Sequence, residues 1–355
     1  MEIKYLKQWE TELNTCIRCG YCFEGCPVFK ELGWEIDGAR GKLITAYGLL
    51  TGKLEPTEYI AEKLFQCTFC RDCVERCSAD VSVPDIMGAV RADLFDAGFS
   101  LPSHKVLTKK IEKSGNIFGK ELKPPEFKGE KTVLLGCRLI ERKEDSEKYL
   151  QILEKLGVKT KTFDETCCGM PFAVLGDKKG FKDQQDKFRD TIPNKDEEII
   201  CACTTCAFFI DNKYPDLKAK YIIDEIVERL PDYQGKLKKL NIKVTYHDPC
   251  NVARGMGMVD EPRDILKKIC SDLVEMPTYG KQAECCGGGG GLLVTDDELA
   301  KSLAEKRVDQ AYETGAEYFT TLCPTCELNL KNAAKKYDGK LKVVNLLDLL
   351  YESLN

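Results

Sequence analysis

The sequence predicts a helical N-terminal domain followed by two copies of an α/β domain, each with a parallel sheet. Two observations lead to this prediction. Apolar residues recur at helical spacing before residue 100, and the rest of the chain repeats one arrangement of cysteines, strands and helices. A segment rich in Pro, Gly and Lys, with Pro124 and Pro125, separates the two regions. The expected domain limits are residues 1–125, 126–240 and 241–355.

Three stretches of the N-terminal region are expected to be helices. Residues 38–50, 57–65 and 85–95 each place apolar side chains three or four positions apart, which is the spacing of one helix face. These helices would frame the eight cysteines that lie between Cys16 and Cys77.

The C-terminal two-thirds of the chain repeats itself. A lone cysteine, a Cys-Cys-Gly triplet and a Cys-x2-Cys hook occur twice, with offsets of 113, 118 and 120 residues. In the first copy a helix over residues 149–156 is expected to close at Gly157 in a left-handed conformation, and in the second a helix covers residues 261–269. The ligands of parallel sheets gather beyond the carboxyl ends of the strands, where every cysteine group is expected. The expected strands are residues 132–136, 159–163, 243–246, 272–276 and 317–321.

Charge and hydropathy exclude two classes of partner. The net charge of -5 results from 53 basic and 58 acidic residues that are mixed along the sequence, so nucleic acid is not expected to bind. No apolar run approaches the roughly 18–20 residues that cross a bilayer, and the first residues lack the apolar stretch of a signal peptide. The protein is therefore expected to be cytoplasmic, without a membrane span of its own.

Cysteine is the unusual component of the chain. It occurs 20 times, whereas His104 and His247 are the only histidines. In a long Lys- and Glu-rich chain without an export signal, this number indicates metal ligation rather than disulfides. The histidines are too few for His-rich zinc sites or bis-His haem, so thiolates are the expected ligands.

Two N-terminal runs of cysteines have the spacing C-x2-C-x2-C-x3-C. In such runs three close thiolates bind one [4Fe-4S] cubane, and the fourth binds the other cubane. A pair of four-cysteine zinc sites is the alternative, but those sites normally separate two C-x2-C hooks by a longer loop. The expected sets are Cys16, Cys19, Cys22 and Cys77 for one cubane, and Cys67, Cys70, Cys73 and Cys26 for the other.

The N-terminal module resembles the α-helical ferredoxin domain of fumarate reductase-type iron–sulfur subunits, because roughly 40 residues with helical spacing separate its two runs. Five thiols in each C-terminal copy exceed the four that a tetrahedral zinc site uses. Each copy resembles a CCG domain of heterodisulfide reductase, and the whole chain resembles that enzyme's fused catalytic subunit. Asn251 departs from the pattern, since relatives often have histidine there. The segments that carry the resemblance are His247–Cys250, Arg254–Gly255, Pro262–Arg263, Glu275–Met276, Cys285–Gly291 and Cys323–Cys326.

The resemblance implies an enzyme that reduces a disulfide as one component of a complex. Each copy would hold a noncubane [4Fe-4S] cluster, and a disulfide such as the coenzyme M–coenzyme B heterodisulfide of methanogenesis would be cleaved between the two. The implied ligands, which are also the implied catalytic residues, are Cys137, Cys167, Cys168, Cys203 and Cys206 for one cluster, and Cys250, Cys285, Cys286, Cys323 and Cys326 for the other.

Two other functions stay open. The chain is also similar to the non-catalytic iron–sulfur subunits of anaerobic glycerol-3-phosphate, glycolate or lactate dehydrogenases, which contain the same modules. An interaction scaffold with zinc in the CCG domains would require that iron be absent there. No G-x-G-x-x-G motif follows a strand, so the electron donor is expected to be a partner, either a flavoprotein or a membrane cytochrome at the inner face of the membrane.

Three residues near the implied clusters are candidates for further roles. His247 is the only imidazole of the C-terminal region; it either donates a proton to a departing thiolate or serves as a structural histidine. Arg138 and Arg254 follow equivalent strand-end cysteines, where they either bind anionic groups of the disulfide or remain solvated charges.

The remaining features concern glycine and the two extra cysteines. The glycine run from Gly287 to Gly291 is expected to let backbone N–H groups approach a cluster closely, the alternative being a flexible turn. Cys201 precedes a hook and Cys270 is expected to end an apolar helix. Both are expected to be buried hydrophobic residues rather than ligands.

Overall fold

The structure is a computed structural model that describes residues 1–355 and consists of two compact units. Neither unit is a continuous stretch of chain. The predicted domain limits after residues 125 and 240 both fall inside unit 2, and they stay a prediction. Unit 1 comprises Met1–Lys109, Gly169–Lys182 and Glu284–Arg307, and unit 2 comprises Lys110–Cys168, Asp183–Ala283 and Val308–Asn355.

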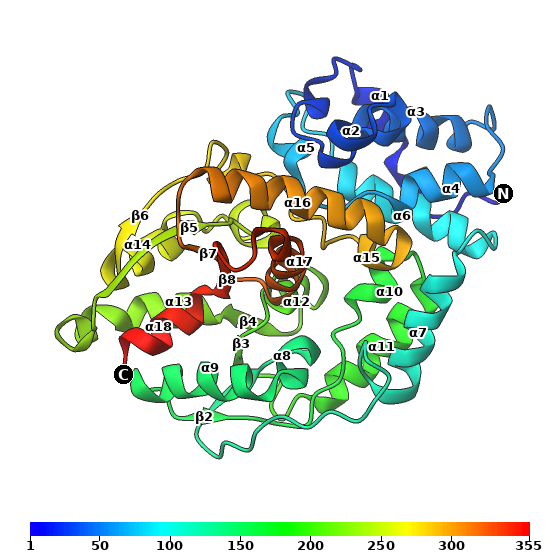
Figure 1. The fold of residues 1–355 in the computed structure, drawn as a ribbon. Helices are drawn as coiled ribbons and strands as arrows, with labels where there is room; N and C mark the ends of the chain where they lie inside the picture. The colour runs from blue at the N-terminus through cyan, green and yellow to red at the C-terminus, as the bar shows by residue number, and fades with distance from the viewer. The chain divides into compact units, whose positions relative to one another are not determined.

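Unit 1 is helical, and the three predicted N-terminal helices are confirmed as α3, α4 and α6 (Figure 1). α4 begins after Thr57, whose Oγ1 accepts a hydrogen bond from the Ile60 N–H at 3.2 Å. Buried Leu43, Leu64 and Val90 join the three helices in one core. The helices that begin in unit 1 are α1 (Glu10–Thr15), α2 (Pro27–Leu32), α3 (Ala39–Leu50), α4 (Glu58–Phe65), α5 (Asp72–Glu75), α6 (Val83–Asp96), α7 (Pro102–Ser114), α10 (Met170–Val174), α11 (Lys178–Thr191), α15 (Leu292–Thr295) and α16 (Asp297–Glu313).

Unit 2 contains two four-stranded parallel sheets with equivalent strand orders, β2-β1-β3-β4 and β6-β5-β7-β8. Val133 of β1 lies opposite Ile200 of β3, and Thr245 of β5 lies opposite Phe319 of β7. The duplicated α/β fold with parallel sheets is thereby confirmed. The strands are β1 (Lys131–Leu134), β2 (Thr160–Lys161), β3 (Glu198–Cys201), β4 (Lys218–Tyr221), β5 (Leu240–Tyr246), β6 (Cys270–Leu273), β7 (Tyr318–Thr321) and β8 (Lys342–Asn345).

Helix ends explain one success and one error of the sequence-based prediction. Gly157 has the predicted left-handed conformation, with φ +80° two residues after the last residue of α9. The prediction that Cys270 ends a helix is wrong, because α14 stops at Ile269 and Cys270 opens β6 with extended angles. β6 therefore starts two residues before the predicted strand, in a partly exposed segment without a clear apolar pattern.

The helices of unit 2 connect the two copies to each other. α18 of the second copy packs against α9 of the first and against α14 of its own copy (Figure 1). A capping box between Asn345 and Asp348 begins α18. The helices wholly within unit 2 are α8 (Cys137–Glu141), α9 (Lys143–Lys155), α12 (Thr204–Lys213), α13 (Ile222–Arg229), α14 (Asp260–Ile269), α17 (Pro324–Ala333) and α18 (Leu346–Ser353).

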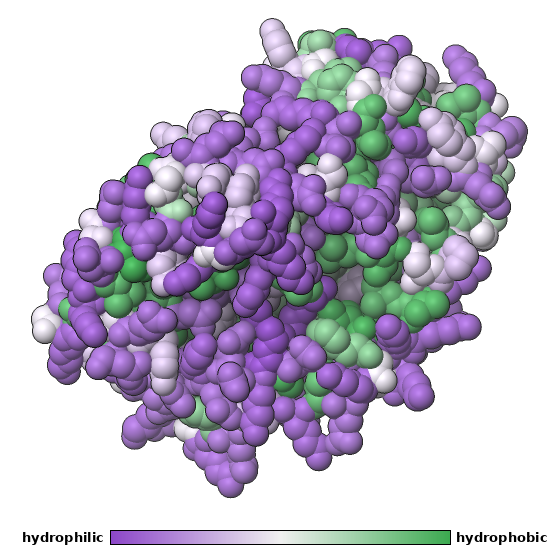
Figure 2. Space-filling view, in the orientation of Figure 1, coloured by the Kyte–Doolittle hydropathy of each residue, from purple (hydrophilic) through white to green (hydrophobic).

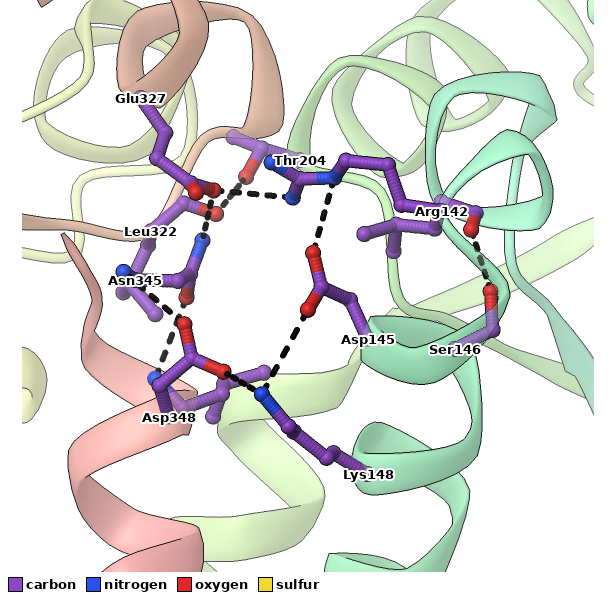
Figure 3. Close-up of polar contacts among 11 residues, drawn as sticks. Arg142, Asp145, Ser146, Lys148, Thr204, Leu322, Glu327, Asn345 and Asp348 are labelled. Carbon is purple, nitrogen blue, oxygen red and sulfur yellow. Dashed lines mark hydrogen bonds and ion pairs between the residues drawn. The ribbon is translucent and has the colours of Figure 1, made fainter. Parts of the chain in front are cut away.

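A polar network joins the ligand-bearing segments of the two copies (Figure 3). Arg142, which follows α8, donates to the carboxylate of Glu327 in α17 at 2.9 Å. Thr204, directly after Cys203, donates to the carbonyl of Leu322, directly before Cys323, at 3.0 Å. Side chains of α9 and α18 extend the network through Lys148. The two Cys-x2-Cys hooks are thus fixed relative to each other.

Replacing Arg142 by Met should destabilise unit 2, because Glu327 keeps a charge that is almost fully buried. The side chains of Arg142 and Glu327 are 27% and 4% exposed, so the expected loss of about 2 kcal/mol lies below the roughly 3–5 kcal/mol for breaking a fully buried pair. Anaerobic thermal unfolding followed by circular dichroism measures this loss.

The control is Lys143→Met, which removes an exposed pair with Glu147 at 3.9 Å and should cost less than about 0.5 kcal/mol. Equal losses in the two variants would contradict the role assigned to Arg142.

Candidate metal centres

The first predicted cubane set lies together in unit 1. Cys16, Cys19, Cys22 and Cys77 line one pocket, although they come from the two different runs. Cys77 Sγ also accepts a hydrogen bond from the Val81 N–H at 3.3 Å. The structure therefore brings together the four thiols that the crosswise pairing of the runs predicts. Cys19 is exposed, so this set reaches the surface.

The second predicted cubane set, also in unit 1, is more deeply buried. Burial raises the pKa of Cys26 to about 12, and the neighbouring thiols Cys70 and Cys67 raise it further. Burial and the thiols of Cys70, Cys67 and Cys26 likewise raise the pKa of Cys73. Four thiols this close cannot ionise together without positive charge among them, which a metal cluster would supply. Their arrangement fits a [4Fe-4S] cubane.

A buried lysine lies beside this second set. Lys42 Nζ donates hydrogen bonds to the backbone carbonyls of Ile36, at 3.4 Å, and Asp37. Burial lowers the pKa of Lys42, whereas the thiols of Cys67 and Cys26 raise it. Lys42 thus provides a positive charge next to sulfur, which favours the anionic form of these ligands.

The five thiols of the first CCG copy gather at the carboxyl edge of their sheet in unit 2. Cys137 and Cys167 share a hydrogen bond, and Cys206 is hydrogen-bonded to Cys168 and Cys203. Hydrogen bonds from neighbouring thiols together with burial raise the pKa values of Cys167 and Cys206. Five buried thiols in contact fit a large, positively charged inorganic group better than a single small ion.

A glycine allows this crowding. Gly136 connects β1 to Cys137 with φ +81°, a conformation that favours glycine. A Cβ atom at Gly136 would lie 2.8 Å from the Cβ of Cys203 and 3.2 Å from the Sγ of Cys206. Any larger residue would therefore push the hook cysteines away.

Three polar residues that sequence reasoning missed hold the first set in place. The carboxylate of Glu165 accepts hydrogen bonds from the N–H groups of Leu135 and Gly136, both at 2.7 Å, and burial raises its pKa to about 8. Gln184 donates to the carbonyl of Cys167 and the Tyr214 hydroxyl donates to the carbonyl of Cys168, both at 2.7 Å. Only Glu165, two residues before the cysteine pair, had a sequence position that pointed to the site.

The cysteines of the second CCG copy are divided between the units. Cys250, Cys323 and Cys326 follow β5 and β7 in unit 2, whereas Cys285 and Cys286 belong to unit 1. In unit 1 the N–H groups of Gly287 and Gly288 donate to the Sγ atoms of Cys285 and Cys286 at 3.4 and 3.5 Å. The expected approach of backbone N–H groups to sulfur is thus present at the start of the glycine run.

Comparison with known proteins assigns these modules. A family model described as a 4Fe-4S dicluster domain matches residues 12–81, and the CCG model, described as a cysteine-rich domain, matches residues 132–211 and 244–331. An iron–sulfur component of the fumarate reductase (CoM/CoB) of Methanothermobacter marburgensis is 30% identical, and the match covers 96% of this chain and 72% of that one. A component of the dihydromethanophenazine:CoB–CoM heterodisulfide reductase of Methanosarcina mazei is 28% identical, with coverage of 97% and 94%. The chain belongs to the family of heterodisulfide reductase iron–sulfur proteins.

Membership of the heterodisulfide reductase family confirms the predicted resemblance and the iron–sulfur character of the chain. A crystal structure of a hypothetical protein from Helicobacter pylori shares the fold, with a TM-score of 0.62 at 11% identity over 99% of this chain and 76% of that one. No helix has the length and apolar content of a membrane span. Figure 2 shows a face on which hydrophilic residues predominate.

Several segments that carry the likeness to heterodisulfide reductase have structural roles in unit 2. Arg263 forms two hydrogen bonds with the carboxylate of Asp248, at 2.7 and 2.9 Å, and contacts Glu275 through Nε at 2.7 Å. Asp248 also accepts a hydrogen bond from the Gly280 N–H at 2.8 Å. These bonds fix the loop that leads from β5 to Cys250.

The three candidates for further roles occupy different surroundings in unit 2. His247 is buried, its backbone N–H donates to the Thr320 carbonyl at 2.8 Å, and its ring lies edge-on to Phe319. Arg254 is also buried, and its Nη1 donates to the carbonyls of Lys281 and Ala283 at 2.8 Å. Arg138 is half-buried in α8. Proton donation by His247 and substrate binding by the two arginines stay predictions.

The extra cysteines Cys201 and Cys270 are both buried, as expected. Cys201 is the last residue of β3 and its Sγ lies 3.9 Å from the carbonyl of Ile199. Cys270 is 2% exposed at the start of β6. Their part in ligation is not indicated by these positions.

Replacing Arg263 by Met should destabilise the Cys250 loop, because Asp248 would keep a buried charge without its two-pronged partner. Their side chains are 6% and 1% exposed, so the loss should be about 3–5 kcal/mol. Anaerobic denaturation measures it, and iron analysis reports whether the loop still supports metal binding.

Arg189→Met serves as the control, since Arg189 also forms a two-pronged pair, with Asp216 at 2.8 and 2.9 Å, but the Asp216 side chain is 47% exposed. That variant should lose at most about 1 kcal/mol and no iron. A similar loss from both would show that burial of Asp248 is not what makes Arg263 important.

Proposed function

We propose that this protein carries electrons through two cubane [4Fe-4S] clusters to two noncubane [4Fe-4S] clusters, which cleave a disulfide such as the coenzyme M–coenzyme B heterodisulfide. The main support is the first CCG copy, in which five buried thiols meet at one sheet edge. A relative of closely similar length bears the name of a heterodisulfide reductase component, which supports the substrate class.

Electrons enter the chain at the cubane held by Cys16, Cys19, Cys22 and Cys77. Cys19 is exposed in this set, and the neighbouring side chains of Ile17 and Tyr21 are 68% and 64% exposed. Exposed apolar side chains around an accessible ligand are suited to contact with a redox protein. The electron-donating partner, a flavoprotein or a membrane cytochrome, would dock on this surface.

The chain's own residues contribute binding, orientation and proton handling at the CCG site. Reduction of a disulfide consumes two electrons and two protons and releases two thiols; the bound clusters supply the electrons. Arg138 lies after the strand-end Cys137, where its charge would hold an anionic group of the disulfide. The buried imidazole of His247 would donate a proton to one departing thiolate, while burial of the thiols keeps water from the site.

Four tetranuclear clusters should give about sixteen irons and as many acid-labile sulfides per chain. The reason is that eighteen cysteines fall into four sets and leave out only Cys201 and Cys270. Metal and sulfide analysis after anaerobic purification provides the count. About eight irons together with stoichiometric zinc would contradict the noncubane clusters and support a zinc scaffold.

Replacing Cys168 by Ala should abolish disulfide reduction by an artificial electron donor while both cubanes remain reducible. Cys168 is hydrogen-bonded to Cys206 within the first CCG set, whereas all eight cubane cysteines lie in unit 1. Turnover of the heterodisulfide and electron paramagnetic resonance of the reduced cubanes measure the two effects.

Cys201→Ala is the matched control, since it removes another buried thiol of the same copy whose Sγ contacts a strand carbonyl. It should retain turnover and iron. Full turnover in the Cys168 variant would favour the electron-relay function known from dehydrogenase complexes over catalysis by this site.

A further inference from the structure

A buried arginine in unit 1 binds three segments that are far apart in the sequence. Arg91, in α6, is fully buried, and its guanidinium group donates hydrogen bonds to backbone carbonyls at the end of α4, after α10 and in the glycine run. The acceptors are the carbonyls of Leu64 at 3.1 and 2.9 Å, and those of Phe65, Cys67, Val174 and Gly290, each at 2.8 Å.

The surroundings of Arg91 are those of a fixed cation. Its guanidinium carbon lies 5.1 Å from the ring centre of Phe65 and 4.6 Å from that of Phe69. Burial lowers its pKa to about 10, which still leaves it charged at neutral pH. Burying a cation is unfavourable unless its donors are satisfied, and here main-chain carbonyls satisfy them. Every one of those hydrogen bonds fixes a backbone position.

Two of the segments held by Arg91 touch each other at a cubane ligand. A Cβ atom on Gly290 would lie 2.3 Å from the carbonyl oxygen of Cys67, and one on Gly289 would lie 2.7 Å from that of Thr68. Gly290 also has φ +62°, which disfavours other residues. Glycine is required here because the two backbones are in direct contact.

This contact joins ligands of two predicted clusters. Cys67 belongs to the second cubane set, and Gly290 follows Cys286 by four residues. The same run provides the N–H groups that donate to Cys285 and Cys286. A short path through backbone atoms therefore leads from the cubane ligand Cys67 to the cysteine pair of the second CCG copy.

We propose that Arg91 and Gly290 fix the contact through which electrons pass from the Cys26–Cys67–Cys70–Cys73 cubane to the cluster of the second CCG copy. This proposal rests on the proposed clusters but not on the identity of the disulfide. In each transfer the cubane loses one electron and the acceptor cluster gains it; no bond or proton changes place. Arg91 is a positioning residue, since it acts through Cys67 and Gly290.

The experiment compares Gly290→Ala and Arg91→Lys with the unaltered protein, each as the full chain loaded with clusters under anaerobic conditions. The cubanes are reduced rapidly by a reduced viologen, and freeze-quench electron paramagnetic resonance follows the electron to the CCG cluster. The added Cβ of the Gly290 variant must push Cys67 away, and lysine cannot replace the branched set of hydrogen bonds. Because a displacement on the order of 1 Å can cost about 100-fold in rate, both variants should transfer electrons about ten- to hundredfold more slowly.

Two further readouts separate positioning from general damage. Iron content and the midpoint potentials of the cubanes should remain unchanged in Gly290→Ala, because its effect is on distance. Gly98→Ala is the matched control. Gly98 follows α6, has φ +89°, and a Cβ there would meet no atom within 4 Å, so this variant shares the backbone strain but not the contact. Its transfer rate should equal that of the unaltered protein.

An unchanged transfer rate in Gly290→Ala would overturn the proposed path, even if Arg91→Lys failed to fold. A normal rate in Arg91→Lys would overturn the positioning role of Arg91. Slow transfer in a protein that reduces no disulfide would support this inference while contradicting the proposed substrate. Absence of an iron-containing acceptor cluster would contradict both.

Discussion

Crowded, buried thiols are the constraint on which the rest of the structure depends. In the first CCG copy, neighbouring thiols and burial raise the pKa values of Cys167 and Cys206, and in the ferredoxin region the same causes raise that of Cys73. Such groups cannot all become anions in an apolar environment unless positive charge accompanies them. Metal clusters would provide that charge, so folding of these regions and cluster binding are expected to be coupled.

The protein answers this constraint with a small number of fixed positive groups. Lys42 in unit 1 lies beside Cys26 and Cys67, and the charge of Arg91 acts on the Cys67 thiol. The N–H groups of Gly287 and Gly288 point to sulfur atoms. Each of these groups is held by main-chain atoms or belongs to the main chain, so its position does not depend on flexible surface side chains.

Duplication produced two similar sheets but not two identical sites. Glu165 braces the strand end of the first copy, and the equivalent position in the second copy is Ala283, whose carbonyl accepts a hydrogen bond from Arg254. In the second copy the strand-end loop is held instead by Arg263 and Asp248. Because each copy fixes its first cysteine by different charges, the two CCG domains are distinguishable environments for chemistry.

The sequence by itself determined the modules and their ligand candidates. Thiol spacing is a local property, so Cys16, Cys67 and their runs were recognisable, and the crosswise pairing of the runs agrees with the way the structure groups their thiols. The repeat of cysteines and β-α-β units likewise predicted two equivalent sheets, which family membership confirms.

Only the tertiary structure decided which polar groups support those ligands. Arg91 is an ordinary helical residue in the sequence, and its acceptors lie between 24 and 199 positions away. Gln184 and Tyr214 reach the Cys167–Cys168 pair from other elements, and the carbonyl partners of Arg254 carry no side-chain signature. Backbone carbonyls accept hydrogen bonds whatever residue bears them, so long-range contacts of this kind leave no pattern that a single sequence can reveal.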